Sequence, residues 1–115
     1  MLYRFERFEL DDEIYSLRRD GEDVAIRPQA LDLLFYLVRH RDRVVTKREV
    51  LDAVWQGAAV SESTIPQAVL AVRRALDDDR EEPRIIQTVR GRGYRFLVEV
   101  QASAGEELVP SSGEA

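Results

Sequence analysis

The amino-acid sequence predicts an α+β fold made of an N-terminal antiparallel sheet, a three-helix bundle and a C-terminal β-hairpin. Two observations carry this prediction. Apolar residues recur at a two-residue period up to about residue 26, change to a helical period after Pro28, and return to the two-residue period near residue 85. The segment TVRGRGYRF, residues 88–96, then places a glycine-rich turn between two apolar runs. A chain of 115 residues is long enough for one domain, which we expect over residues 1–100.

Composition narrows the possible classes of protein. The chain has no cysteine, which excludes disulfides, thiolate metal sites and cysteine nucleophiles. No apolar run approaches the length of a membrane span, and the first ten residues lack the apolar block of a signal peptide. We therefore expect a soluble, cytoplasmic protein whose chain makes no membrane contact.

The N-terminal region predicts a small antiparallel sheet of three strands. Its first apolar side chains alternate imperfectly with charged ones, and Glu6-Arg7 indicates an irregularity such as a bulge. Asp20-Gly21 is a hairpin turn signal. The expected strands cover residues 3–10, 14–17 and 24–26.

Two helices follow the sheet. Pro28 is suited to a first helical turn, and apolar residues then recur at helical spacing as far as Val38. The second helix is expected to begin at Thr46, because TKRE has the form of a capping box in which Thr46 and Glu49 cap each other. We expect Trp55 to be a core residue and residues 56–60 to form a loop.

The third helix is expected over about residues 63–76. Ile65, Val69, Val72 and Leu76 follow the spacing i, i+4, i+7 and i+11 and form one apolar stripe. Pro66 is tolerated only where its N–H would be unpaired, so the cap is expected at Ser63. The opposite face holds Ser63, Gln67, Leu70, Ala71 and Arg74, with Thr64 and Arg73 flanking it.

The last hairpin concentrates positive charge on an acidic chain. The formal net charge is -5, yet residues 84–96 hold four arginines and no acid. Strands are expected over residues 85–89 and 94–100, joined by the tip Arg90-Gly91-Arg92-Gly93, whose glycines can adopt positive φ. Tyr94 and Phe96 should point inward while Arg90 and Arg92 point outward. Residues 101–115 are expected to be a disordered tail or the start of a linker.

This order of elements is that of a winged helix-turn-helix. An α-helix fits the major groove of B-DNA, and an arginine on a hairpin suits the negative potential of a narrow minor groove. The sequence therefore predicts binding to double-stranded DNA, with helix 63–76 in the major groove and the hairpin, residues 88–96, in the minor groove.

The stretches VVTKREVLDAVW, SESTIPQAVLAVRRALDDD and RIIQTVRGRGYRF resemble the OmpR/PhoB-type winged-helix DNA-binding domain of bacterial transcription regulators. The resemblance spans about residues 2–100. Because the domain starts at Met1, it is similar to the N-terminally placed kind found in CadC/ToxR-like and one-component regulators. It implies a cytoplasmic, nucleoid-associated regulator, and a further short strand between or beside the helices.

The resemblance also implies roles for individual residues. Arg90 matches the groove-reaching arginine of the family, with Arg92 and Arg95 assisting on phosphates and Arg73 near them. The loop 56–61 matches a segment that contacts RNA polymerase in activators, and members often bind direct repeats as a tandem pair. The implied DNA-binding residues are Ser63, Thr64, Gln67, Ala71, Arg73, Arg74, Arg90, Arg92 and Arg95.

Other interpretations remain open. Ala68, Leu70 and Ala71 stand where many members carry polar or basic residues. The overall acidity, Leu70, Ala71 and Pro66 would also suit a winged-helix module that binds other proteins and little or no DNA. An enzyme is not expected, because His40 is the only histidine and there is no phosphate-binding loop. The run Asp77–Asp79 is expected to be a solvated turn, and no metal or other cofactor is expected.

Overall fold

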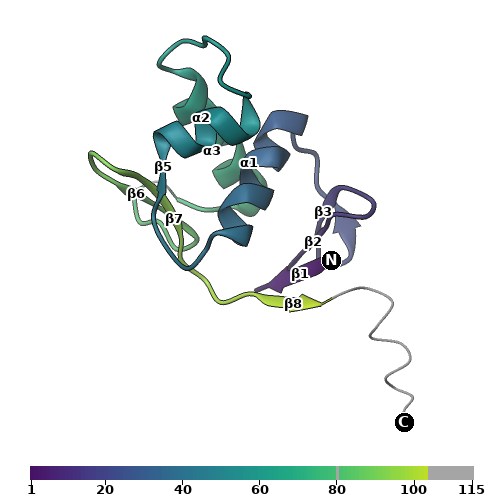
Figure 1. Cartoon of the computed structure of the whole chain (residues 1–115). Helices are drawn as coiled ribbons and strands as arrows, with labels where there is room; N and C mark the ends of the chain where they lie inside the picture. Colours follow the sequence, from purple (N-terminus) through teal and green to yellow (C-terminus); the bar gives the residue numbers. More distant parts are fainter. Residues whose placement is uncertain (80, 104–115) are drawn as a thin grey trace. The chain divides into compact units, whose positions relative to one another are not determined.

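The computed structural model describes residues 1–79 and 81–103, which form two compact units (Figure 1). The first unit contains residues 1–24 and the described residues from 99 onward. The second contains residues 25–98. The first is an antiparallel sheet, and the second combines three helices with a smaller sheet that includes the C-terminal hairpin. The predicted α+β winged-helix fold is therefore confirmed.

The first unit is a five-stranded sheet with strand order β4-β3-β2-β1-β8, and all neighbours are antiparallel. Its apolar side chains alternate along the strands, so they share one face of the sheet, and this face is buried. The strands are β1 (Leu2–Phe5), β2 (Phe8–Asp11), β3 (Ser16–Arg19), β4 (Glu22–Asp23) and β8 (Gln101–Ser103). The buried side chains are Tyr3, Phe5, Phe8, Leu10 and Leu17.

The strand boundaries differ from those expected. Glu6-Arg7 is a two-residue turn rather than a bulge, because Phe5 pairs directly with Phe8. Glu6 adopts φ 53°, which a glutamate rarely does, so the sequence gives no sign of a turn here. The next strand runs over Ser16–Arg19 and not 14–17, and the strand expected at 24–26 is replaced by β4. The turn at Asp20-Gly21 is confirmed, with φ of 53° and 85°.

Residues 101–103 correct a second expectation. The sequence predicts a disordered tail or the start of a linker here, but these residues form β8, which pairs with β1 so that Leu2 lies opposite Ser103. A strand of glutamine, alanine and serine has little tendency of its own to be a strand, and pairing with β1 accounts for it. The rest of the expected tail, residues 104–115, lies outside the described residues.

The exposed face of this sheet carries charges that neutralise each other. The register places Arg4 opposite Glu9, Glu9 opposite Arg18, and Arg18 opposite Asp23. Arg4 Nε lies 3.2 Å from Glu9 Oε2, and Arg18 Nε lies 3.3 Å from Asp23 Oδ1. Each exposed pair contributes little to stability, but the row alternates in sign and leaves this face without a net positive patch.

The second unit contains helices α1 (Pro28–Arg39), α2 (Lys47–Val54) and α3 (Thr64–Leu76), and α1 packs against both others. Its sheet has the order β5-β7-β6 and is antiparallel, as Figure 1 shows. A further short strand does lie between two helices, but this strand, β5, pairs with the hairpin and not with the N-terminal sheet that the resemblance implies. The strands are β5 (Val45–Thr46), β6 (Ile86–Val89) and β7 (Gly93–Phe96).

The helix starts follow the sequence signals. Pro28 is the first residue of α1, where its missing N–H costs no hydrogen bond. At α2, Thr46 Oγ1 accepts from the Glu49 amide at 3.1 Å, and Glu49 Oε1 accepts from the Thr46 amide at 3.0 Å, which confirms the capping box. Trp55 is buried, as expected.

Gly93 fulfils a different requirement from the one expected. Val89 pairs with Gly93, so the tip is Arg90-Gly91-Arg92 and Gly93 belongs to β7. Only Gly91 uses positive φ, at 75°. A Cβ on Gly93 would lie 1.9 Å from the carbonyl oxygen of Val45, so glycine is what allows β5 to approach β7.

Replacing Gly93 should therefore unfold the hairpin sheet. We expect Gly93→Ala to lower the free energy of unfolding by roughly 3 kcal/mol or more, because the obstacle is backbone and cannot rotate away. Gly91→Ala is the matched control: its Cβ would meet nothing within 4 Å, and only its left-handed φ is penalised, by about 1–2 kcal/mol. Urea unfolding of both variants measures the difference, and equal stabilities would contradict the close approach.

The capping carboxylate of α2 also anchors the end of α1. Arg43 donates two hydrogen bonds to Glu49, and the Tyr36 hydroxyl lies 3.2 Å from Glu49 Oε2. Hydrogen bonds from the Arg43 guanidinium, and then from the Thr46 amide, lower the pKa of Glu49 from 4.5 to about 2. The charged carboxylate is therefore the form that stabilises the fold.

This pKa shift predicts a pH dependence of stability. A lowered pKa in the folded state contributes stability that is complete above pH 4.5 and is lost as the pH falls toward 2. Glu49→Gln should be less stable than the parent at pH 7, and the difference should shrink between pH 4.5 and pH 2. Urea unfolding at several pH values tests this, and a difference that stays constant over that range would contradict it.

Candidate nucleic-acid interface

Helix α3 begins with a cluster of hydroxyl groups. Ser63 is its N-cap, as expected, and Pro66 is its third residue, where no intrahelical partner for the N–H exists. Ser61 Oγ lies 3.1 Å from Ser63 Oγ and 3.2 Å from Thr64 Oγ1. Pro66 therefore does not disturb the helix, and the hydroxyls of its first turn lie together.

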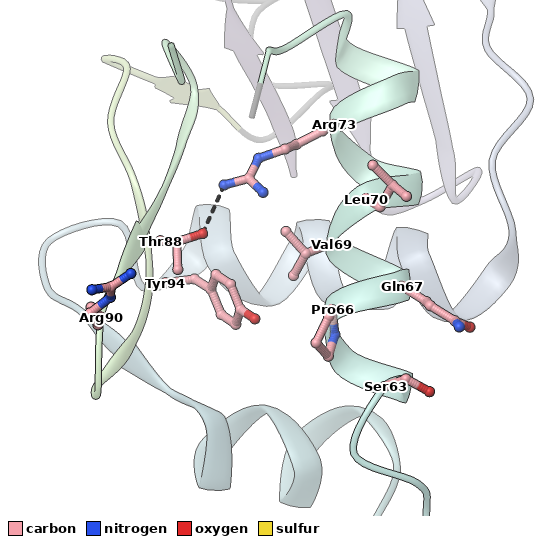
Figure 2. A pocket seen from close by; sticks show the side chains of 9 residues that line it. All are labelled: Ser63, Pro66, Gln67, Val69, Leu70, Arg73, Thr88, Arg90 and Tyr94. Atoms are coloured by element: carbon pink, nitrogen blue, oxygen red, sulfur yellow. Dashed lines mark hydrogen bonds between the residues drawn. The ribbon is translucent and has the colours of Figure 1, made fainter. Parts of the chain in front are cut away.

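The outward face of α3 is polar at its ends and small or apolar in the middle. Ser63, Gln67 and Arg74 are exposed, whereas Thr64, Leu70 and Ala71 are half-buried. Figure 2 shows Ser63 and Gln67 pointing away from the hairpin. Arg74 is the only fully exposed cation on this helix, so α3 offers hydrogen-bonding groups and apolar contact but little positive charge.

Arg73 does not lie on the outward face, which corrects its expected place near phosphates. It is 8% exposed, and its Nη2 donates to the Ile86 carbonyl and to Thr88 Oγ1, both at 3.0 Å (Figure 2). Its Nε is buried and has no hydrogen-bond partner among the residues that the structure describes. Arg73 therefore ties α3 to β6 and acts as a positioning residue for the hairpin.

Asp78 supplies a second tie that sequence reasoning missed. The chain leaves α3 through Asp77 at φ 57°, and the next carboxylate, Asp78, turns inward and is 9% exposed. Asp78 Oδ1 accepts from the amides of Arg84 and Ile85 at 2.8 and 3.1 Å, and Oδ2 accepts from the Ile86 amide at 2.9 Å. The expected solvated turn at 77–79 therefore contains a buried anchor for the start of β6.

The hairpin presents its arginines outward. Arg90, Arg92 and Arg95 are exposed, whereas Tyr94 and Phe96 are buried, so the expected division between charged and aromatic positions is confirmed. The Arg92 amide donates to the Val89 carbonyl at 2.9 Å, which closes the tip. The tight tip holds Arg90 and Arg92 beyond the end of the sheet.

A groove of about 590 Å³ separates α3 from the hairpin. In Figure 2 the Tyr94 ring extends from the hairpin toward Pro66 and Val69. Burial raises the pKa of the Tyr94 hydroxyl, and the Arg73 charge opposes this, so the hydroxyl stays protonated at neutral pH and can donate a hydrogen bond. The groove is lined by Ser63, Pro66, Gln67, Val69, Leu70, Arg73, Thr88, Arg90 and Tyr94.

The distribution of unpaired cations singles out this region. Several arginines elsewhere are neutralised: Arg7 bonds Asp20 at 2.7 Å, and Arg43 bonds Glu49. Most arginines that keep no partner lie in the second unit. Among residues 1–79 and 81–103, the arginines whose guanidinium makes neither an ion pair nor a hydrogen bond are Arg19, Arg27, Arg74, Arg90, Arg92 and Arg95.

A family model described as "Transcriptional regulatory protein, C terminal" matches residues 21–96, which include every helix and the whole hairpin. The chain belongs to the OmpR/PhoB-type family of winged-helix domains of transcriptional regulators. The family resemblance inferred from the three sequence stretches is thereby confirmed.

Individual relatives agree with the family assignment. The chain is 32% identical over 103 residues to the transcriptional activator CadC of Escherichia coli, covering 86% of the chain and 20% of CadC. It is 35% identical over 88 residues to the phosphate regulon regulatory protein PhoB of Pseudomonas aeruginosa, covering 76% of the chain and 38% of PhoB. The chain thus spans well under half the length of these relatives.

Solved structures show the same fold. The RstA DNA-binding domain of Klebsiella pneumoniae, crystallised with the RstA box, has a TM-score of 0.75 and 26% identity, covering 83% of the chain and 95% of that domain. The DNA-binding domain of E. coli CadC has a TM-score of 0.74 and 29% identity, covering 87% and 94%.

The described part of the chain lacks two further features. No helix there is long and apolar enough to span a membrane. No group of three or more histidine, cysteine, aspartate or glutamate side chains there could hold a metal ion. His40 packs against Tyr36, with ring centroids 4.3 Å apart.

The Asp78 anchor can be tested by stability. Asp78→Asn keeps one acceptor oxygen but points an NH₂ group at a backbone amide, so we expect a loss of roughly 2–4 kcal/mol in the free energy of unfolding. Asp79→Asn is the matched control, because Asp79 is exposed and, within the described part of the chain, its Oδ1 accepts a single hydrogen bond, from the Glu81 amide at 2.9 Å. Urea unfolding compares the two, and equal losses would show that Asp78 does not anchor β6.

Proposed function

We propose that this domain binds specific sites in double-stranded DNA to regulate transcription, with α3 in the major groove and the hairpin in the adjacent minor groove. The observation that carries the proposal is the groove between α3 and the hairpin. It is lined by Arg90, and Arg74, Arg92 and Arg95 on the same helix and hairpin likewise have no partner among the described residues. Phosphates provide the anions that such arginines lack within the fold.

In this arrangement α3 reads base edges. Ser63, Thr64 and Gln67 supply hydrogen-bonding groups at its first two turns, and Gln67 can pair with both N6 and N7 of an adenine. Ala71 allows close approach to the bases, and the apolar Leu70 suits a thymine methyl group. Arg74, at the exposed C-terminal part of the helix, contacts a phosphate.

The hairpin supplies the second contact. Arg90 enters the minor groove, where a narrow groove strengthens the attraction for arginine, and Arg92 and Arg95 contact the flanking phosphates. Arg73 sets the position of the hairpin relative to α3 and does not contact DNA itself. The two grooves are therefore contacted by one connected unit.

The relatives support the proposal. The RstA domain was solved with the RstA box, which is a DNA complex of a domain with this fold. CadC is a transcriptional activator and PhoB is a regulatory protein. Both proteins are much longer than this chain.

Further partners follow from the family. We propose that the domain binds direct-repeat half-sites as a tandem pair, because α3 has few cations and one copy makes few phosphate contacts. The exposed loop 56–61 suits contact with RNA polymerase. A protein with this role works in the cytoplasm, on the nucleoid.

One observation favours a second function, a module that binds other proteins. In the middle of its outward face α3 carries the apolar, half-buried Leu70 and Ala71, and the net charge of the chain is -5. Salt dependence separates the two functions. DNA binding weakens by about 0.9 log units per phosphate contact for each tenfold rise in salt, whereas an apolar protein contact does not.

The direct test is Arg90→Ala. We expect it to weaken binding to a duplex selected by the parent protein from a random pool by about 1–3 kcal/mol, because one minor-groove contact is lost. Titrations by fluorescence anisotropy at 0.05 to 0.3 M salt give the affinity and its salt slope.

Arg39→Ala serves as the charge-matched control, since Arg39 stacks over Phe35 at the other end of the second unit's first helix and keeps its own contacts. It should bind nearly as well as the parent. If binding is independent of salt, or if Arg90→Ala binds as well as the parent, the DNA proposal fails.

A further inference from the structure

Helix α1 begins at an arginine that does not stabilise the helix. Arg27 is the N-cap residue, and its side chain makes no capping hydrogen bond. The first turn of α1 also contains no acidic residue. Helix N-termini favour serine, threonine, aspartate or asparagine as caps and negative charge nearby, so a cation at this position opposes the helix dipole. Folding of α1 therefore gives no reason for an arginine here.

Arg27 lies beside helix α3. Together with the first residues of α1 it borders a small cavity of about 90 Å³ whose other side is formed by Trp55 and by α3. The residues of α3 that border this cavity are Thr64, Gln67, Ala68 and Ala71. The larger groove toward the hairpin lies on the other flank of α3, and Gln67 borders both hollows. Helix α3 is thus flanked by Arg27 on one side and by Arg90 on the other.

The guanidinium of Arg27 is available for a ligand. Arg27 is exposed, and within the described residues it makes no ion pair and no hydrogen bond. Helix α3 has no free cation in its N-terminal half, because Arg73 is committed to β6 and Arg74, its only other arginine, lies in the last turn. Among the residues that the structure describes, the free cation on the flank of α3 away from the hairpin, near its N-terminal half, is therefore Arg27.

The geometry points to Arg27 as a phosphate-binding residue on the DNA strand opposite the one that the hairpin reaches. This inference rests on the proposed function. The major groove is about 12 Å wide and is bordered by a sugar-phosphate backbone on each side, so a helix lying in it has phosphates on both flanks. The hairpin arginines serve one flank. Arg27 serves the other, and the two together fix the rotation of α3 about its own axis in the groove.

A phosphate contact has a specific salt signature. Each contact contributes about 0.9 to the slope of log K against log salt, so its loss weakens binding about eight-fold at 0.1 M salt and has little effect at 1 M. We expect Arg27→Ala to lower the slope by about 1 and to do so equally on the selected duplex and on random-sequence duplex. Arg27→Lys should retain most of the slope, because a phosphate accepts either cation.

The controls separate this contact from folding and from net charge. Arg27→Ala should unfold in urea like the parent, since the side chain makes no bond within the fold. Arg39→Ala removes the same charge from the far end of the same helix, about 18 Å away, and should leave the slope unchanged. Arg90→Ala, measured beside them, reports whether the hairpin contact is present.

Each outcome supports or contradicts phosphate binding by Arg27. A slope lowered by Arg27→Ala, restored by Arg27→Lys and unaffected by Arg39→Ala supports the contact. If Arg90→Ala weakens binding but Arg27→Ala matches the parent at every salt concentration, Arg27 does not bind phosphate and the proposed function stands. If Arg39→Ala lowers the slope as much, the effect is one of net charge and the inference fails. If the parent protein shows no salt-dependent binding, both proposals fail.

Discussion

The positions of helix α3 and the hairpin depend on two buried side chains. Arg73 reaches from α3 to the Ile86 carbonyl and to Thr88, and Asp78 holds the amides at the start of β6. Both side chains form hydrogen bonds with backbone groups, and Arg73 also bonds the Thr88 hydroxyl. These hydrogen bonds fix the position of β6 without adding apolar contact. Because β6 leads directly into the tip, these bonds determine where Arg90 is held relative to α3.

Ion pairing within the fold explains how an acidic chain carries a basic surface. On the sheet of the first unit, arginines alternate with acids across the strands, and at the start of α2 Glu49 binds Arg43. The internal pairs neutralise cations that play no part in the proposed interface. The cations left without partners lie mainly on the hairpin, at the end of α3 and at the start of α1. Position, not total charge, is what suits this domain to a polyanion.

Much of the fold was predictable because its signals are local. A capping box, a proline at a helix start and alternating aromatics need only neighbouring residues to take effect, and all were confirmed. The turn at Glu6 and strand β8 were not predictable, since each depends on pairing between segments. Arg73 could have been recognised: it follows Val69 by four residues and precedes Leu76 by three, which places it beside the apolar stripe. Asp78 gave no such signal. Its partners are the backbone amides of residues 84–86, and nothing in the sequence around Asp78 shows that the chain returns to it there. The roles of the outward residues on DNA stay predictions.

The central claim is that α3 and the hairpin contact adjacent grooves as one unit. Dimethyl sulfate footprinting tests it directly, because the reagent methylates guanine N7 in the major groove and adenine N3 in the minor groove. With the parent protein at saturation, we expect protection at guanine N7 within each half-site and at adenine N3 about half a helical turn, roughly five base pairs, away. With Arg90→Ala at saturation, only the adenine protection should disappear. Protection confined to one groove in the parent, or loss of both protections together in the variant, would contradict the account.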